Sequence, residues 1–150
     1  MKNNILKRLT EDELPAVAEL ESLCFSEPWS VNSLRLLTTS DAIGFVCIDG
    51  GHAVAYGGML YAPFEGQITN VAVAPDARRQ GFGRAILEAL IHDANEKGLE
   101  QISLEVRESN EAAIALYQSF GFYTAGVRKN FYKHPTENGL VMLKPMKEER

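Results

Sequence analysis

Three arginines and two glycines fall within the seven residues 78–84, which read RRQGFGR. The segment follows an apolar run, residues 67–73, that predicts a strand, and it opens a helical pattern that ends near Lys97. A helix N-terminus presents free N–H groups and partial positive charge, and glycines let a ligand approach them closely. Because the first turn holds an arginine and no acid, the segment predicts binding of an anion such as a diphosphate.

Two better-known phosphate motifs do not fit this segment. A Walker A loop places four residues between its glycines and continues with Lys and Ser or Thr, whereas only Phe82 separates the glycines here. The dinucleotide-binding fingerprint requires a third glycine where this chain has Ile86. The alternative to a phosphate site is a solvated basic loop, which the order of strand, proline, arginines and amphipathic helix disfavours.

A second stretch contains a carboxylate and a phenol. The alternating residues 101–106 put aliphatic side chains on one face of a strand and Glu105 on the other, near the carboxyl end, where ligands gather in α/β sheets. Asn110 caps a short helix, residues 111–120, and Tyr117 lies two turns beyond this cap. Such a pair suits acyl transfer to an amine: the carboxylate removes a proton from the nucleophile, and the phenol returns one to the leaving thiolate. The alternatives are an exposed acid at a strand end and an aromatic residue of the core.

The elements that must position these residues predict a mixed α/β domain. Thr10 and Glu13 form a capping box for a first helix, Ser30 caps a second, and residues 49–51 (DGG) predict a hairpin turn. The expected helices cover residues 10–23, the segment from 30, 81–97 and 111–120. The expected strands cover residues 5–9, 43–48, 53–61, 67–73, 101–106, 122–128 and 140–145. Two early helices, an antiparallel meander and alternating strands and helices describe an α+β mixed sheet.

The composition is that of an ordinary globular protein. The 150 residues suit one domain spanning residues 1–150, with 45% hydrophobic and 23% charged residues. No apolar run reaches the ~20 residues of a membrane span, and the N-terminus lacks the apolar core of a signal peptide, so we expect a cytoplasmic protein without a membrane partner. The net charge of -5 argues against direct nucleic-acid binding and suits a basic macromolecular partner.

The cysteines and histidines give no sign of a metal or redox centre. Cys24 and Cys47 stand among apolar neighbours, so we expect small buried hydrophobes rather than a disulfide or a nucleophile. His52, His92 and His134 are scattered without ligand spacing. We therefore expect no metal site.

These motifs resemble a known family. The pattern V-A-V-x-P followed by R-x-x-G-x-G is similar to the acetyl-CoA pyrophosphate loop of the GNAT N-acetyltransferase superfamily. The stretch L-E-V-R-x-S-N-x-x-A-I-x-L-Y-x-x-x-G-F, together with FSEPWS at residues 25–30, resembles the RimI family of ribosomal-protein alanine N-acetyltransferases over nearly the whole chain. The resemblance implies the GNAT fold, with a mainly antiparallel, partly parallel central sheet flanked by helices, and acetyl-CoA as co-substrate.

The resemblance also implies roles for matching residues. Glu105 would be the general base, Tyr117 the general acid, and Asn110 would contact the CoA arm. The strand edge that binds pantetheine and the loop that surrounds the pyrophosphate would comprise Val71, Ala72, Val73, Arg78, Arg79, Gln80, Gly81, Phe82, Gly83 and Arg84. Family members acetylate the N-terminal alanine of a small-subunit ribosomal protein, which implies a protein N-terminus as the acceptor and a bacterial source.

One position departs from the family pattern. Family members commonly carry Glu-Asp-Ala near the C-terminus, and this chain has Glu137, Asn138 and Gly139. The missing carboxylate bears on peptide specificity more than on chemistry and keeps transfer to a small amine open. A third alternative, an acyl-CoA-binding module without catalysis, is disfavoured because Glu105 and Tyr117 are both retained.

The chemistry of the amine favours an N-terminus over a lysine. The neutral amine is the nucleophile, and with pKa values of about 8 and about 10.4 the lysine costs roughly 3 kcal/mol more to deprotonate. Glu105, with a reference pKa of ~4.3, needs either a value raised by burial or a water relay to act at neutral pH. The sequence leaves both routes open.

Overall fold

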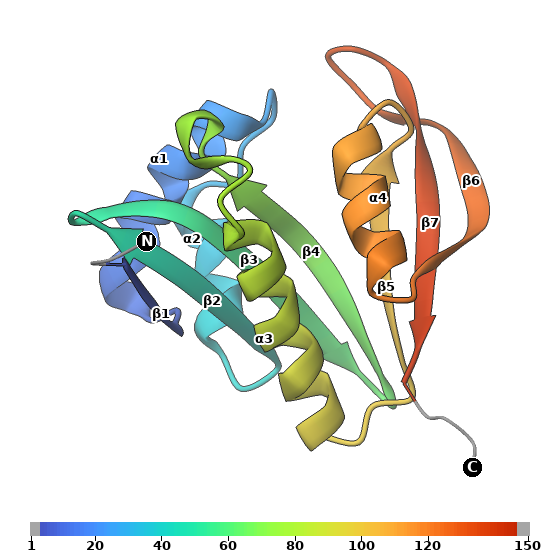
Figure 1. Cartoon of the computed structure of the whole chain (residues 1–150), viewed down its shortest axis with the longest axis horizontal. Coiled ribbons are helices and arrows are strands. Elements are labelled where there is room, and N and C mark those ends of the chain that lie inside the picture. Colours follow the sequence, from blue (N-terminus) through green and yellow to red (C-terminus); the bar gives the residue numbers. More distant parts are fainter. Residues whose placement is uncertain (1–3, 147–150) are drawn as a thin grey trace.

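The computed structural model describes residues 4–146 as a seven-stranded sheet with helices against both faces (Figure 1). The expected domain limits, residues 1–150, lie partly outside this range. The strands are β1 (Asn4–Arg8), β2 (Ala42–Asp49), β3 (His52–Ala62), β4 (Glu65–Val73), β5 (Gln101–Arg107), β6 (Tyr123–Tyr132) and β7 (Glu137–Pro145). They lie in the order β1-β2-β3-β4-β5-β7-β6, and every neighbouring pair is antiparallel except β4 and β5. The expected mixed sheet, mainly antiparallel and partly parallel, is therefore confirmed.

Early and late helices cover opposite faces of this sheet. The helices are α1 (Leu14–Cys24), α2 (Val31–Leu34), α3 (Phe82–Glu96) and α4 (Glu111–Ser119), with 3₁₀ turns at Glu11–Glu13, Arg35–Thr38 and Pro75–Ala77. A Cβ on Gly57 of β3 would meet Ile86 and Leu90 of α3, whereas a Cβ on Gly58 would meet Leu37 of the turn after α2. Figure 1 shows α4 on the same side as α3, in front of β5. No helix of the described residues is long and apolar enough to cross a membrane.

The first helix forms where its sequence signals predict it. The N–H of Thr10 donates to the Glu13 carboxylate at 2.8 Å, as a capping box requires, and the Thr10 hydroxyl donates to the same carboxylate at 2.9 Å. The chain first makes a 3₁₀ turn and then enters α1, with Pro15 in the first turn, where no N–H is needed. Ser30 caps α2 by accepting from the N–H of Ser33 at 3.2 Å, although α2 is only one turn long.

The last hairpin is longer than the sequence predicts. β6 extends to Tyr132 and β7 begins at Glu137, instead of ending at 128 and beginning at 140. β6 is an edge strand whose side chains are almost all exposed, so neither of its faces carries the apolar alternation that marks a strand in a sequence. The unexpected part of the hairpin, residues 129–139, contacts Arg107 at the end of β5.

The one parallel pair determines where a site can form. β4 and β5 pair only from Glu65 to Gln67 and from Gln101 to Ser103, after which no pairing joins them. Figure 1 shows the two ribbons diverging beyond this point. Near the divergence β4 has a bulge: Gly58 pairs with Asn70 and Met59 with Ile68, which leaves Thr69 without a partner on β3. The carboxyl halves of both strands therefore keep one unpaired edge each.

Candidate active site

A cavity of about 540 Å³ opens between β4 and β5 where the strands part. Its walls are the free edge of β4, the carboxyl half of β5, the α1–α2 loop and the end of β6. α4 contributes Tyr117, and α1 contributes Glu21 and Cys24. The cavity therefore joins the predicted catalytic strand to segments that the sequence analysis did not connect with it.

Glu105 lies in the wall of this cavity. The side chains of β5 alternate as predicted, with Ile102, Leu104 and Val106 buried and Glu105 on the opposite face. Its side chain is 22% exposed, and its Oε2 lies 3.0 Å from Nε of Arg128 on β6. An incoming amine must therefore use the other carboxylate oxygen or displace Arg128.

Tyr117 lines the same cavity from α4. It is the one buried residue of that helix, and its ring packs against Phe122 with 5.8 Å between centroids. Burial raises the pKa of Tyr117 to about 12, and the neighbouring Tyr132 adds to the shift. A place in the core and a role as a proton donor are thus compatible for Tyr117. Its ring packs in the core, and the residue keeps its phenolic proton beside the cavity at neutral pH.

Asn110 caps α4 as predicted. Its Oδ1 accepts a hydrogen bond from the N–H of Ala113 at 3.2 Å, and the residue also lines the cavity. Tyr132, at the end of β6, is a cavity residue that the sequence analysis did not single out. Burial and the Glu105 carboxylate raise the pKa of Tyr132 to about 12.

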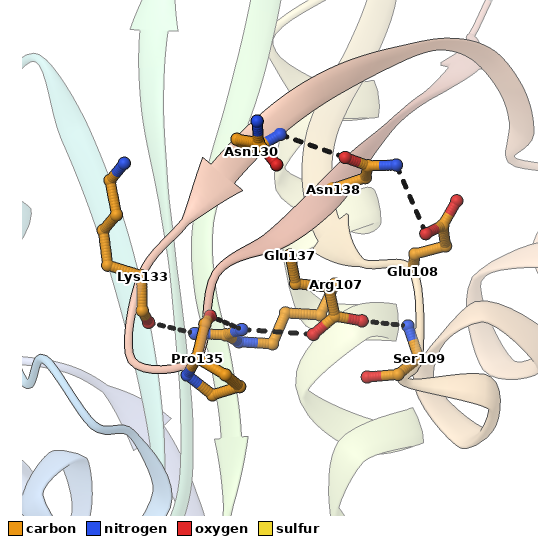
Figure 2. A network of polar contacts seen from close by, with 8 residues as sticks. All are labelled: Arg107, Glu108, Ser109, Asn130, Lys133, Pro135, Glu137 and Asn138. Atoms are coloured by element: carbon orange, nitrogen blue, oxygen red, sulfur yellow. Dashed lines mark hydrogen bonds and ion pairs between the residues drawn. The ribbon is translucent and has the colours of Figure 1, made fainter.

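Arg107 fixes the tip of the β6–β7 hairpin against the end of β5, as Figure 2 shows. Its Nη1 donates to the carbonyl of Pro135 at 2.9 Å and to Glu137 at 3.1 Å, and its Nη2 donates to the carbonyl of Lys133 at 2.7 Å. The guanidinium also lies 4.6 Å from the ring centroid of Tyr132. We call these contacts the Arg107 clamp; they hold Tyr132 at the cavity.

Glu137 serves the same clamp. One carboxylate oxygen accepts from Arg107, and the other accepts from the N–H of Ser109 at 2.6 Å. The hydrogen bonds from Ser109, followed by the guanidinium of Arg107, lower the pKa of Glu137. This carboxylate therefore connects the hairpin to the loop that leads into α4.

Asn138, which departs from the family pattern, does not line the cavity. Its Oδ1 accepts from the N–H of Asn130 at 3.0 Å, and its Nδ2 donates to Glu108 at 3.5 Å (Figure 2). The residue joins the hairpin to the β5–α4 loop. Its position gives it a part in the local fold and no contact with the cavity.

The predicted phosphate segment forms the N-terminus of α3. The first intrahelical hydrogen bond runs from the N–H of Ala85 to the carbonyl of Gly81, at 3.0 Å, which leaves the N–H groups of Phe82, Gly83 and Arg84 without an intrahelical acceptor. Gly81 has φ +90°, and nothing lies within 4 Å of the place a Cβ would occupy. The backbone is thus open to a ligand, as the sequence predicts. Phe82 is 3% exposed and packs in the core, so only its N–H remains for binding.

The arginines of the segment carry positive charge that no carboxylate of residues 4–146 offsets by an ion pair. Arg78 Nε donates to the carbonyl of Val73 at 3.0 Å, and Arg84 Nη2 donates to Ser119 at 3.3 Å. Arg79 has φ +68° and is exposed. Three uncompensated cations beside free N–H groups suit a doubly charged anion.

The expected pantetheine edge, residues 71–73, is partly occupied. The carbonyl of Val73 already accepts from Arg78 and, at 3.4 Å, from the thiol of Cys24. Cys24 is half-buried and lines the cavity, which corrects the expectation of a buried residue; Cys47 is buried as expected. Burial raises the pKa of both thiols. In the described residues no three His, Cys, Asp or Glu side chains gather as a metal site needs.

Glu21 is a cavity residue that the sequence analysis missed. It is fully buried on α1, and its carboxylate accepts from the N–H of Trp29 at 2.8 Å, from Asn70 Nδ2 at 2.6 Å and from the hydroxyl of Tyr56. Burial and this carboxylate raise the pKa of Tyr56. No local signal marks Glu21, because an acid within an amphipathic helix is usually part of the solvated face.

Comparison with known proteins gives one family. The acetyltransferase (GNAT) family profile matches residues 14–122. The chain is 38% identical over 136 residues to the [ribosomal protein bS18]-alanine N-acetyltransferase of Escherichia coli, covering 91% of this chain and 90% of that protein. The Salmonella typhimurium protein of the same name is 35% identical over 162 residues, covering 95% and 98%. The crystal structure of the ribosomal-protein-S18-alanine N-acetyltransferase from Escherichia coli matches with a TM-score of 0.89 and 34% identity, covering 98% of this chain and 96% of that one.

Proposed function

Because the chain belongs to the GNAT acetyltransferase family, and within it to the ribosomal-protein alanine N-acetyltransferases, we propose that its acceptor is the N-terminal alanine of ribosomal protein bS18. The family, the fold and the activity expected from the motifs are confirmed: the chain is an acetyl-CoA-dependent N-acetyltransferase. The observation that carries the acceptor is the 38% identity over 91% of the chain. A ribosomal acceptor also agrees with action in the cytoplasm.

The N-terminus of α3 supports diphosphate binding. Its free N–H groups, the open backbone at Gly81 and the unpaired arginines supply donors and charge for the diphosphate of acetyl-CoA. The free edge of β4 at Val71 supplies backbone groups for the pantetheine amides, and Asn110 stands beside the same cavity. Acetyl-CoA would thus bring its thioester to the cavity that holds Glu105 and Tyr117.

In the proposed reaction, Glu105 accepts a proton from the α-amine of the acceptor, directly or through a water molecule. The amine nitrogen forms a bond to the acetyl carbonyl carbon while the bond from that carbon to sulfur breaks. Tyr117 donates its phenolic proton to the departing thiolate and so yields CoA. The raised pKa of Tyr117, about 12, keeps this proton available at neutral pH. The transfer is direct, without an acyl-enzyme.

The position of Asn138 weakens the case for a small-molecule acceptor. That alternative came from the missing acid at position 138, and the side chain of Asn138 lies outside the cavity in contact with Asn130 and Glu108. Glu137 matches the first acid of the family pattern, and it accepts a hydrogen bond from Arg107 in the Arg107 clamp.

The acceptor is tested with three kinds of substrate. We expect acetylation of an Ala-initiated hexapeptide on its α-amine, and none of the same peptide with a blocked N-terminus and a free lysine. A panel of free amines, including polyamines and amino acids, should be turned over far more slowly. Mass spectrometry that places the acetyl group on lysine, or faster turnover of a free amine, would contradict the proposal.

A further inference from the structure

Glu21 is an unusual residue for the interior of a protein. It is the one buried charged side chain among the described residues, and no lysine, arginine or histidine pairs with it. Removing a carboxylate from water without a cation is costly, so the hydrogen bonds it accepts must offset that cost. Packing alone would favour an apolar residue here, which suggests that the carboxylate serves the site.

The donors to Glu21 come from three separate parts of the site. Trp29 donates from the α1–α2 loop, Tyr56 from β3 and Asn70 from the free half of β4. Asn70 is 49 residues away in sequence and lines the cavity. Glu21 therefore connects one wall of the cavity to the strand that borders it.

This contact fixes the orientation of the Asn70 carboxamide. Nδ2 has two hydrogens and two acceptors, Glu21 Oε2 at 2.6 Å and the Tyr56 oxygen at 3.1 Å. A carboxylate only accepts, so the nitrogen of the amide must face it and the oxygen must face away.

The oxygen of the Asn70 carboxamide is accessible. This oxygen has no hydrogen-bond partner within residues 4–146. If it were also buried, it would be a buried polar atom without a partner, and the one such side-chain atom in these residues is Thr69 Oγ1. The Asn70 oxygen is therefore not buried, and Asn70 is a residue of the cavity wall. This oxygen is a fixed hydrogen-bond acceptor.

Asn70 and Glu105 flank the cavity from opposite strands. The last parallel pair is Gln67 with Ser103. If the same register is continued along both strands, Asn70 lies opposite the residue that follows Glu105. Both residues line the cavity. A reacting amine between the strands has more than one N–H, and the general base removes only one proton. A second acceptor, on the opposite strand, can bind a remaining N–H and so hold the amine beside Glu105 before the reaction.

We propose that Asn70 binds the acceptor and that Glu21 is a positioning residue: the Asn70 carboxamide oxygen, turned into the cavity by the buried Glu21 carboxylate, accepts an N–H from the reacting amine beside Glu105. The inference rests on the proposed function only for the identity of that amine as a protein α-amine. It assigns a specificity-determining role to a pair of residues that lie in neither of the two sequence motifs used for catalysis.

The first test is the kinetics of Asn70→Ala and Glu21→Gln with the Ala-initiated peptide. Each variant should raise the KM for the peptide about tenfold, the effect of one lost hydrogen bond to the substrate, and change kcat less than threefold. In Glu21→Gln the new amide can present its own N–H to Asn70 and turn the carboxamide around. The dissociation constant of acetyl-CoA, measured by its thermal shift, should stay unchanged in both.

The second test exchanges the amide and the carboxylate. In the double variant Glu21→Gln with Asn70→Asp, the introduced glutamine would supply the N–H groups. The introduced aspartate would accept them with one oxygen, and its other oxygen would face the cavity. The peptide KM of the double variant should lie closer to that of the parent than either single variant does. A purely structural role predicts that the double variant changes stability and leaves the peptide KM where the single variants put it.

A matched control loses a hydrogen bond of the same kind away from the cavity. The hydroxyl of Tyr61 donates to Asp93 at 2.6 Å, and Tyr61→Phe should reduce stability without changing the peptide KM. A side-chain ¹⁵N–¹H signal of Asn70 that is protected from exchange in the parent and loses protection in Glu21→Gln would support the positioning role without any acceptor.

The outcomes separate the two proposals. Parental peptide KM in Asn70→Ala, or no rescue in the double variant, would overturn the inference and leave the proposed function intact. If the parent acetylates a free amine and no peptide, the proposed function fails, and the same KM comparison is made with that amine. An increase in the dissociation constant of acetyl-CoA equal to the increase in peptide KM would assign Asn70 to the co-substrate and refute the inference.

Discussion

The two halves of the cavity are built in different ways. The half assigned to acetyl-CoA consists, apart from Asn110, of consecutive residues, 71–84, and offers backbone groups of a strand edge and a helix N-terminus. The half assigned to the acceptor is assembled by side chains that are distant in sequence: Glu21 with Asn70, and Arg107 with the hairpin tip at Lys133. Recognition by backbone leaves a local sequence motif, whereas an assembly of distant side chains leaves none.

The largest effect should come from the carboxylate that both halves share. Glu105→Gln should lower kcat by about 10²- to 10⁴-fold, the usual contribution of a general base, because the amide cannot take a proton. The thermal shift with acetyl-CoA should remain near normal. Turnover equal to the parent across the pH range would require a different base, and loss of the thermal shift would place Glu105 in the acetyl-CoA half.

Tyr117→Phe tests the acid that α4 contributes to the cavity. The ring keeps its packing against Phe122, so stability should change little, while kcat should fall about 10²-fold because the thiolate receives no proton. With a pKa of about 12, Tyr117 stays protonated at neutral pH and loses its proton only in strong alkali. A fall in activity with a midpoint near pH 8 that disappears in Tyr117→Phe would contradict this assignment.

Gly81→Glu tests the acetyl-CoA half alone. A ligand that binds only the native state adds about 2.7 kcal/mol at a hundredfold excess over its dissociation constant, and an acid at the N-terminus of α3 should abolish this gain. Gly98→Glu is the matched control, because Gly98 also has positive φ, at +68°, with open space around it, at the other end of α3. Equal loss of the thermal shift in both variants would mean that backbone strain, not the charge, is responsible.

Arg107→Lys tests how the hairpin is held in the acceptor half. A lysine cannot reproduce the three hydrogen bonds of the guanidinium, so the hairpin tip and Tyr132 should loosen. The peptide KM should rise about fivefold, with acetyl-CoA binding unchanged. Arg35→Lys is the control, since Arg35 forms an exposed pair with Glu11, at 2.7 Å, away from the cavity. An unaltered peptide KM would show that the hairpin does not contact the acceptor.

This contrast explains what the sequence could predict. The strands and α3 carry apolar periodicity, and the segment from Arg78 to Arg84 is contiguous, so the fold and the open N-terminus of α3 could be predicted from local patterns. Glu105 and Tyr117 could be placed because the period of a strand and the turn of a helix fix their directions. Glu21 could not, because its burial depends on donors that only the tertiary fold brings together. The exposed strand β6 gave no periodicity, and so the Arg107 clamp could not be foreseen.

Asn138 is the position where sequence and structure lead to different expectations. From the family pattern, an aspartate here would restore peptide activity. In the structure an aspartate would lose the amide that donates to Glu108 at 3.5 Å and would place two carboxylates side by side, while its oxygen could still accept from Asn130. Asn138→Asp should therefore lower the free energy of unfolding by about 0.5 kcal/mol, which corresponds to a decrease in Tm of about 1–2 °C. The turnover of the peptide should stay unchanged.

A second variant identifies the cause of this decrease in Tm. Repulsion requires two carboxylates, so it should disappear when Glu108 is replaced by an amide. Adding Glu108→Gln should remove it at pH 7, because the new amide can donate to the introduced aspartate. A gain in peptide turnover in Asn138→Asp would contradict this expectation. It would show that position 138 affects the acceptor, and the acceptor half of the cavity would then include this part of the hairpin.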